Sequence, residues 1–127
     1  MTDLSRLIAA EQPLVLSSLA RGALPLVLSD LARACRGTGN AARAVFVAPD
    51  EQAMIAIADA APFFAPELEV IEFPAWDCLP YDRSSPALSV SARRLAALQA
   101  LQGKAPKDSG RPQLLVTTVN ALLQRVL

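Results

Sequence analysis

The sequence contains no histidine among its 127 residues, and its two cysteines, Cys35 and Cys78, form no CxxC pair. Histidine is the commonest general base and the commonest protein ligand for metals, so its absence argues against most metal-dependent and acid–base enzymes. Two cysteines far apart are most simply explained by an intracellular, reducing environment, although a disulfide between them stays open. We therefore expect no metal, no cofactor and a cytoplasmic location.

The chain also lacks an excess of either charge, because it has twelve basic and twelve acidic residues. A free-standing nucleic-acid-binding domain usually has a basic excess. The charges are unevenly placed, with eight acids and no base between Asp50 and Asp82. This run is not dense enough to form a charged tail, so a solvated acidic face is the simpler interpretation and a surface patterned for a partner is the alternative.

No segment reads as a signal peptide or a membrane span. The N-terminus has no basic region ahead of a long apolar core. The most apolar stretch, from Leu14 to Leu28, is interrupted by Arg21, Gly22 and Pro25, so it is a poor candidate for crossing a bilayer. We expect no contact with a membrane.

What the chain does have is a 53% hydrophobic composition, enough for one packed core. Four short apolar runs are typical of strands: Leu14–Leu19, Ala44–Ala48, Leu68–Phe73 and Gln113–Thr117. Uninterrupted apolar strands that alternate with helices indicate a parallel sheet buried on both faces. We predict an α/β fold, a three-layer sandwich with a mainly parallel sheet, in residues 14–127, preceded by a helical lead-in over residues 1–13.

Helical patterns fill the intervals between these runs. They cover Met1–Ala10, Leu26–Cys35, Asp50 to about Ala60, a segment that Ser89 or Ser91 can cap, and Val119–Leu127. Asp50 is placed to cap its helix, and Leu95, Leu98 and Leu101 share one face of theirs. Because the last helix runs to the end of the chain without a cap, we expect the sequence to be a fragment of a longer protein.

The first strand–turn–helix follows the outline of a phosphate-binding loop, GxxxxGK[ST]. Ser17 stands at the first glycine and Gly22 keeps the second, but Ala23 and Leu24 replace the lysine and the hydroxyl. The lysine neutralises phosphate and the hydroxyl holds magnesium. The stretch is therefore predicted to be a vestigial phosphate loop without ATP hydrolysis, and an ordinary strand–turn–helix is the alternative.

Two segments carry a more specific resemblance. "FPAWDCLPYDRSSPALSVSARRLAALQAL", followed by "LLVTTVNALLQRV", is similar to the N-terminal UvrB-like region of bacterial transcription-repair coupling factors, the Mfd family. The likeness covers nearly the whole chain from about Leu14. The matching positions are Trp76, Asp77, Leu79, Pro80, Tyr81, Asp82, Ser85, Pro86, Arg94, Leu95, Val119, Asn120, Leu122, Gln124 and Arg125.

The resemblance implies a degenerate helicase-like domain, similar to the first domain of UvrB, that is not itself an enzyme. In the family this module supports recruitment of UvrA to stalled RNA polymerase in nucleotide excision repair and restrains the DNA translocase. The expected partners are the other domains of the longer protein and UvrA, mainly through the following domain. RNA polymerase, DNA and ATP would be engaged only by the full-length protein, whose motor and polymerase-binding domain lie further along the chain.

Candidate site residues follow from the same comparison, with no catalytic residue among them. Three would anchor a partner or hold the proline-rich connector: Trp76, Tyr81 and Asp82. Four are candidates for contact with DNA or a neighbouring domain: Thr117, Thr118, Arg93 and Arg94. The alternatives are a solvated helix face for the two arginines and strand-end hydroxyls without a ligand for the two threonines. For Asp77 and Asp82 we expect capping or salt-bridge roles rather than acid–base chemistry. The alternative function is a divergent nucleotide-binding or DNA-binding domain of helicase type.

Overall fold

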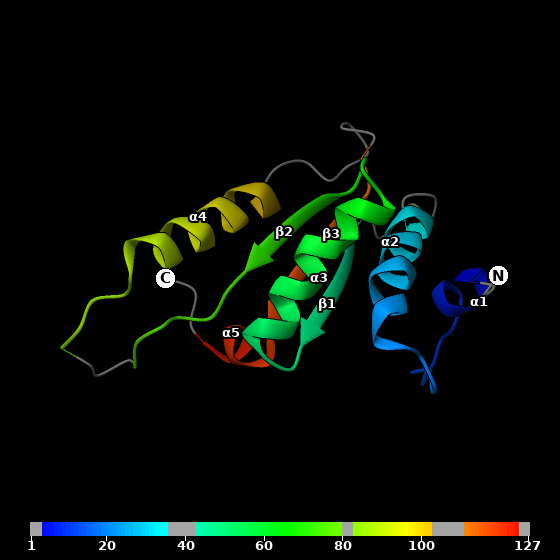
Figure 1. Ribbon diagram of the computed structural model, residues 1–127, viewed down its shortest axis with the longest axis horizontal. Coiled ribbons are helices and arrows are strands. Elements are labelled where there is room, and N and C mark those ends of the chain that lie inside the picture. The colour runs from blue at the N-terminus through cyan, green and yellow to red at the C-terminus, as the bar shows by residue number, and fades with distance from the viewer. Residues whose placement is uncertain (1–3, 36–42, 80–82, 103–110, 125–127) are drawn as a thin grey trace.

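The structure, a computed structural model, describes residues 4–35, 43–79, 83–102 and 111–124. Within these residues a three-stranded parallel sheet lies between helices (Figure 1). The elements are α1 (Leu4–Ile8), the 3-10 turn η1 (Arg21–Ala23), α2 (Leu24–Cys35), β1 (Arg43–Ala48), α3 (Glu51–Phe64), β2 (Glu69–Phe73), α4 (Leu88–Gln102), β3 (Gln113–Thr118) and α5 (Val119–Leu123). The predicted α/β class with a parallel sheet is confirmed.

The central strand of the sheet is β3, in the order β1-β3-β2. Both neighbours run parallel to it, with Arg43 and Glu69 opposite Gln113 at one end and Val47 and Phe73 opposite Thr117 near the other. This position explains why β3 is the most buried strand, since it has neighbours on both edges and helices over both faces.

One face of the sheet is covered by α2 and α3, which also contact each other. The core on this side is built mainly from small side chains, including Ala32, Ala44 and Ala61, around Met54 and Leu114. Small residues let the two helices approach the strands closely, so this layer is well packed.

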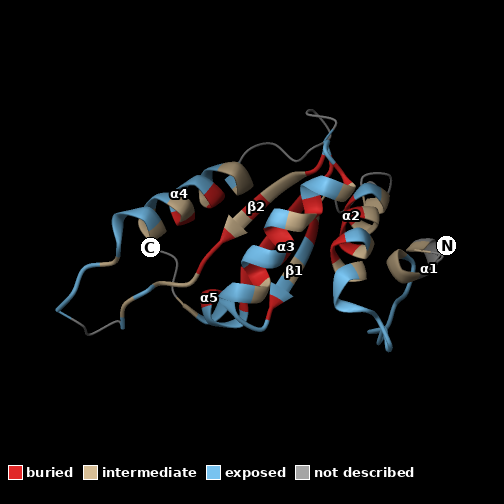
Figure 2. Ribbon diagram, viewed as in Figure 1, coloured by how far each residue is buried: buried red, intermediate tan, exposed pale blue. Residues whose placement is uncertain are grey.

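The other face is covered by α4 and α5, but only over part of the sheet. A second cluster joins Ile71 and Phe73 of β2 to Ala97 of α4 and Ala121 of α5. The β1 strand lies outside this cover, and its Val45 is 55% exposed. Figure 2 shows buried residues concentrated between the sheet, α2 and α3. The sheet thus has helices on both faces, and α4 and α5 cover their face only in part.

The predicted first strand, Leu14–Leu19, is wrong. These residues form an exposed segment without regular structure, in which Val15 is 90% exposed. The chain then passes through η1, closed by a bond from the Ala23 N–H to the Ala20 carbonyl (2.9 Å), directly into α2. An apolar run shows that a segment favours burial, but a strand also needs a partner strand, and among the described residues this one has none.

Helix starts were predicted with mixed success. Asp50 is confirmed as the cap of α3, because its carboxylate accepts the Ala53 N–H at 2.8 Å. The α3 helix continues past the predicted end through Pro62 to Phe64, since Ala61 and Ala65 are fully buried in the core and hold the last turn there. The described parts of the first and last helices, Leu4–Ile8 and Val119–Leu123, are shorter than predicted.

The prediction for α4 is wrong in two respects. The helix begins at Leu88, so Ser89 and Ser91 lie inside it and do not cap it. Leu95 is 67% exposed, whereas Leu98 and Leu101 are packed against the core. The side chains that α4 buries fully are Arg94 and Ala97, because a guanidinium between aromatic rings takes the inward position that a leucine was expected to fill. Among the described residues, no helix combines the length and apolar character that crossing a bilayer requires.

Candidate interaction cleft

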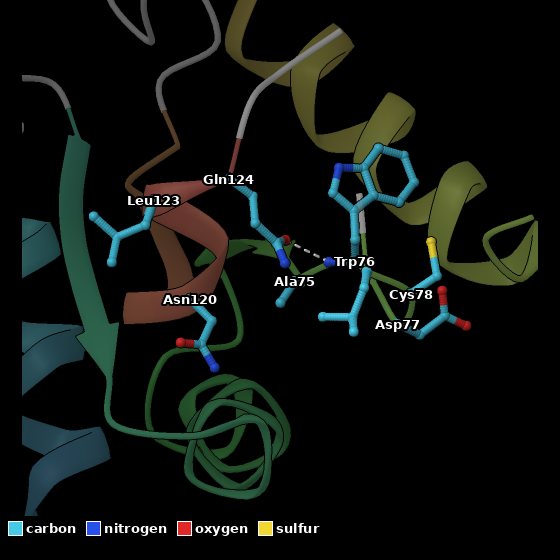
Figure 3. A pocket seen from close by; sticks show the side chains of 8 residues that line it. Ala75, Trp76, Asp77, Cys78, Asn120, Leu123 and Gln124 are labelled. Atoms are coloured by element: carbon cyan, nitrogen blue, oxygen red, sulfur yellow. Dashed lines mark hydrogen bonds between the residues drawn. The ribbon is translucent and has the colours of Figure 1, made fainter. Parts of the chain in front are cut away.

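A cleft of about 530 Å³ lies where the connector after β2 meets α5, which follows β3 (Figure 3). It is lined by Ala75, Trp76, Asp77, Cys78 and Leu79 of the connector and by Asn120, Leu123 and Gln124 of α5 and its end. Both walls begin at the carboxyl ends of parallel strands, and such ends are where open α/β sheets most often bind ligands. We therefore take this cleft as the candidate functional site.

The two walls are joined by a hydrogen bond. The backbone N–H of Trp76 donates to Oε1 of Gln124 at 2.6 Å, drawn as a dashed line in Figure 3. Because this bond uses the amide oxygen, the amide nitrogen of Gln124 is left with its two donors. The connector is thus fixed to α5 at the base of the cleft, and the cleft does not depend on a ligand for its form.

Arg94 supports the connector from behind. Its guanidinium lies 4.2 Å from the ring centre of Phe73 and 4.3 Å from that of Trp76. Its Nη1 donates to the Pro74 carbonyl at 2.6 Å, but its buried Nη2 has no hydrogen-bond partner. Burial lowers the pKa of Arg94, yet a guanidinium stays charged at neutral pH. Arg94 therefore holds Trp76 by cation–π stacking without a carboxylate partner among the described residues.

Asp77 links the connector to the start of α4. Both oxygens of its carboxylate lie 3.2 Å from the N–H of Ala87, the residue before the helix. The capping role expected for Asp77 is confirmed by this contact. The carboxylate is exposed and lines the cleft as well, so it contributes a negative charge to the surface that a partner would meet.

The residues predicted to contact DNA or a neighbouring domain are largely occupied by internal bonds. Thr117 is fully buried and its hydroxyl donates to the Phe73 carbonyl at 2.9 Å. Thr118 is buried and its hydroxyl oxygen accepts the Ala121 N–H at 3.1 Å, which caps α5. Arg93 forms an ion pair with Glu72, and Arg94 is buried. Only Arg93 therefore keeps its charged group at the surface.

The remaining predicted positions fall into two groups. Tyr81 and Asp82 lie outside the described residues. The vestigial phosphate-loop residues lie at the start of α2, where Ser17 and Gly22 are exposed and Ala23 and Leu24 are half-buried. A Cβ atom added to Gly22 would meet nothing within 4 Å, so close packing does not explain the glycine. Within residues 4–20, which the structure describes, no strand precedes this turn, and none of its residues lines the cleft.

Asn120 and Gln124 were not predicted as site residues, although both belong to the segment that carries the resemblance. The signal that could have found them is their spacing in the predicted helix Val119–Leu127, where residues four apart share one face; in the structure Gln124 directly follows the last residue of α5. What the spacing alone does not reveal is that this face turns toward Trp76, since that depends on the packing of α5 against the sheet.

The described residues contain no group of three or more cysteine, aspartate or glutamate side chains that could hold a metal ion. Burial raises the pKa of the Cys35 thiol, which makes its reactive thiolate form less accessible. No family model, no curated protein and no solved structure matches the chain.

Proposed function

We propose that this chain is a non-catalytic interaction module of the kind found at the N-terminus of transcription-repair coupling factors. In that role it supports recruitment of UvrA to stalled RNA polymerase and helps to restrain the translocase of the longer cytoplasmic protein. The helicase-like ancestry of the fold belongs to the same proposal. It is supported by the resemblance in sequence and by an α/β fold with a parallel sheet.

The observation that carries the proposal is the convergence of three separate segments. Trp76 and Asp77 come from the first part of the family signature, Arg94 from the helix that follows, and Gln124 from the last part. Arg94 stacks on Trp76, and Gln124 accepts the Trp76 N–H. Residues that carry a resemblance and also contact one another in the fold are more simply explained by a shared structural role than by chance.

The alternative, a divergent nucleotide-binding domain, predicts affinity for Mg-ATP. We expect isothermal titration of the 127-residue chain with Mg-ATP to give no binding heat, because Ala23 and Leu24 offer neither a cation nor a metal ligand where phosphates would lie. A dissociation constant in the range of about 1–100 µM would contradict the non-catalytic assignment.

The interaction itself is tested with purified partners. The chain is immobilised and exposed to UvrA and, separately, to a transcription-repair coupling factor that lacks its own N-terminal UvrB-like region. We expect association with at least one of them, with a dissociation constant of roughly 1–100 µM, as for transient interfaces. If the chain associates with neither protein, the proposed function is wrong.

A further inference from the structure

The cleft between the connector and α5 has the features of a peptide-binding site. At about 530 Å³ it falls within the range of roughly 300–1,000 Å³ that small-ligand pockets occupy. Trp76 lines it, with its ring stacked on the Arg94 guanidinium at 4.3 Å and its backbone N–H bonded to Gln124. A rigid, half-buried tryptophan next to a hollow is the type of residue that dominates binding energy at protein interfaces.

The chemistry of the lining indicates what the cleft would hold. Leu79 and Leu123 are exposed apolar side chains at its margin. Asn120 is exposed, and Gln124 retains free amide donors, so both can bond to the main chain of an extended segment. An apolar anchor with polar groups that fix its orientation is the usual composition of such a site.

The charged side chains near the cleft indicate which kind of partner it favours. Among the described residues, eight line the cleft, and Asp77 is the charged one of these eight. Asp50 and Glu51, at the start of α3, lie at the same carboxyl edge of the sheet as α5 (Figure 1). The Arg94 charge is sealed behind the Trp76 ring and the connector. The Asp77 carboxylate therefore makes the described part of the cleft favourable for a cation.

We propose that the cleft binds a short protein segment in which an apolar residue is flanked by lysine or arginine. The apolar side chain would rest on Trp76, the amides of Asn120 and Gln124 would bond to the main chain, and the basic side chains would face Asp77. This inference rests on the proposed function, because it assigns a docking surface and a class of partner segment to the interaction module.

Trp76 is the single tryptophan of the chain, so its fluorescence reports directly on the site. The probe is the blocked heptapeptide Lys-Arg-Ala-Leu-Ala-Arg-Lys, titrated into the 127-residue chain at about 0.05 M ionic strength. We expect a saturable change in emission with a dissociation constant of roughly 10–500 µM, weakening severalfold at about 0.5 M salt. The acidic peptide Glu-Asp-Ala-Leu-Ala-Asp-Glu, and a basic peptide with glycine in place of leucine, should each bind at least about fivefold more weakly.

Three variants locate the binding. Asp77→Asn removes the charge but keeps an oxygen for the Ala87 N–H, and should weaken the basic peptide about three- to tenfold. Asn120→Ala should weaken it by a similar factor. The matched control is Asp59→Asn, an exposed acid on α3 that does not line the cleft, and it should leave binding unchanged. Alkylation of Cys78, which lines the cleft, should slow when the peptide is bound, while alkylation of Cys35 should not.

The outcomes separate this inference from the proposed function. Equal effects of Asp77→Asn and Asp59→Asn, or no change in Trp76 emission with the basic peptide, would refute the cleft as a docking site even if the chain associates with UvrA or the coupling factor. Tighter binding of the acidic peptide or of a single-stranded thymidine oligonucleotide would refute the assigned chemistry. If the peptide binds but neither protein does, the docking site stands and the proposed function is wrong.

Discussion

Arg94 carries a positive charge into a site that offers it two aromatic rings and one carbonyl oxygen. Its side chain is 2% exposed, and its Nη2 has no partner. A buried donor left unpaired costs about 1–3 kcal/mol, which the contacts with Phe73 and Trp76 offset in part. The residue therefore serves to fix the position of Trp76 more than to stabilise the fold.

This interpretation predicts an order of stability among variants. Arg94→Lys should lower the free energy of unfolding by about 2–3 kcal/mol, because an ammonium stays buried and charged but cannot stack flat between two rings. Arg94→Met should cost only about 1 kcal/mol or less, since the unpaired donor and the desolvated charge disappear together. Urea denaturation measures both values. Arg93→Met, at the half-exposed neighbouring position, is the control with a small expected effect, and a larger loss for Arg94→Met than for Arg94→Lys would contradict the account.

At the scale of elements, the two helices that follow β1 and β3 begin with side-chain caps. Asp50 accepts the Ala53 N–H ahead of α3, and Thr118 accepts the Ala121 N–H ahead of α5. The caps differ in what they position, because α3 covers the core while α5 carries Asn120 and Gln124 into the cleft.

Thr118→Val should therefore have two effects. Loss of the cap should lower the free energy of unfolding by about 1 kcal/mol, and a shift of Gln124 should change the Trp76 emission of the folded chain. Asp50→Ala should cause a similar loss of stability and leave the Trp76 emission as it is. Thr118→Ser keeps the hydroxyl and should retain both properties. Identical emission from all three variants would show that the cleft does not depend on how α5 is capped.

The elements themselves were largely predictable from the sequence. Three of the four predicted strands lie within one residue of the observed bounds, and Asp50 caps α3 as expected. These features depend on local chemistry, namely apolar runs and a carboxylate ahead of a helix. Leu14–Leu19 is equally apolar but stays exposed. A strand forms only where a neighbouring strand can pair with it, and the residues of the segment itself do not show whether such a neighbour is present.

The cleft was not predictable for a related reason. Trp76 was identified as a candidate anchor, but its contacts with Arg94 and Gln124 join residues 18 and 48 positions away in the chain. Helical periodicity assigned Leu95 to the core, whereas the inward position belongs to Arg94. Such a substitution of charge for leucine becomes favourable only when two aromatic rings from other segments converge on the site.

At the scale of the whole molecule, a group of surface interactions at Arg33 joins α2 to the end of α3 and to the turn that leads into β2. Arg33 on α2 bonds to Glu67, in the turn between α3 and β2, at 2.6 Å and to the carbonyl of Phe64, the last residue of α3, at 3.2 Å. It also pairs with Asp30 within its own helix at 3.1 Å. These interactions hold α2 against the segment that leads into the edge strand β2.

The Arg33–Glu67 pair gives the fold a predictable dependence on pH. Its hydrogen bond to Arg33 lowers the pKa of Glu67 in the folded chain below the ordinary value, which is about 4.3 in the unfolded chain. The folded state therefore gains stability above that pH and loses it as the pH falls toward the lowered pKa. We expect Glu67→Gln to reduce the loss of stability between neutral pH and about pH 3.5, measured by urea denaturation across the range. Asp59→Asn, which removes an exposed acid without an ion pair among the described residues, should leave the pH dependence unchanged, and equal slopes for both variants would exclude this pair as its source.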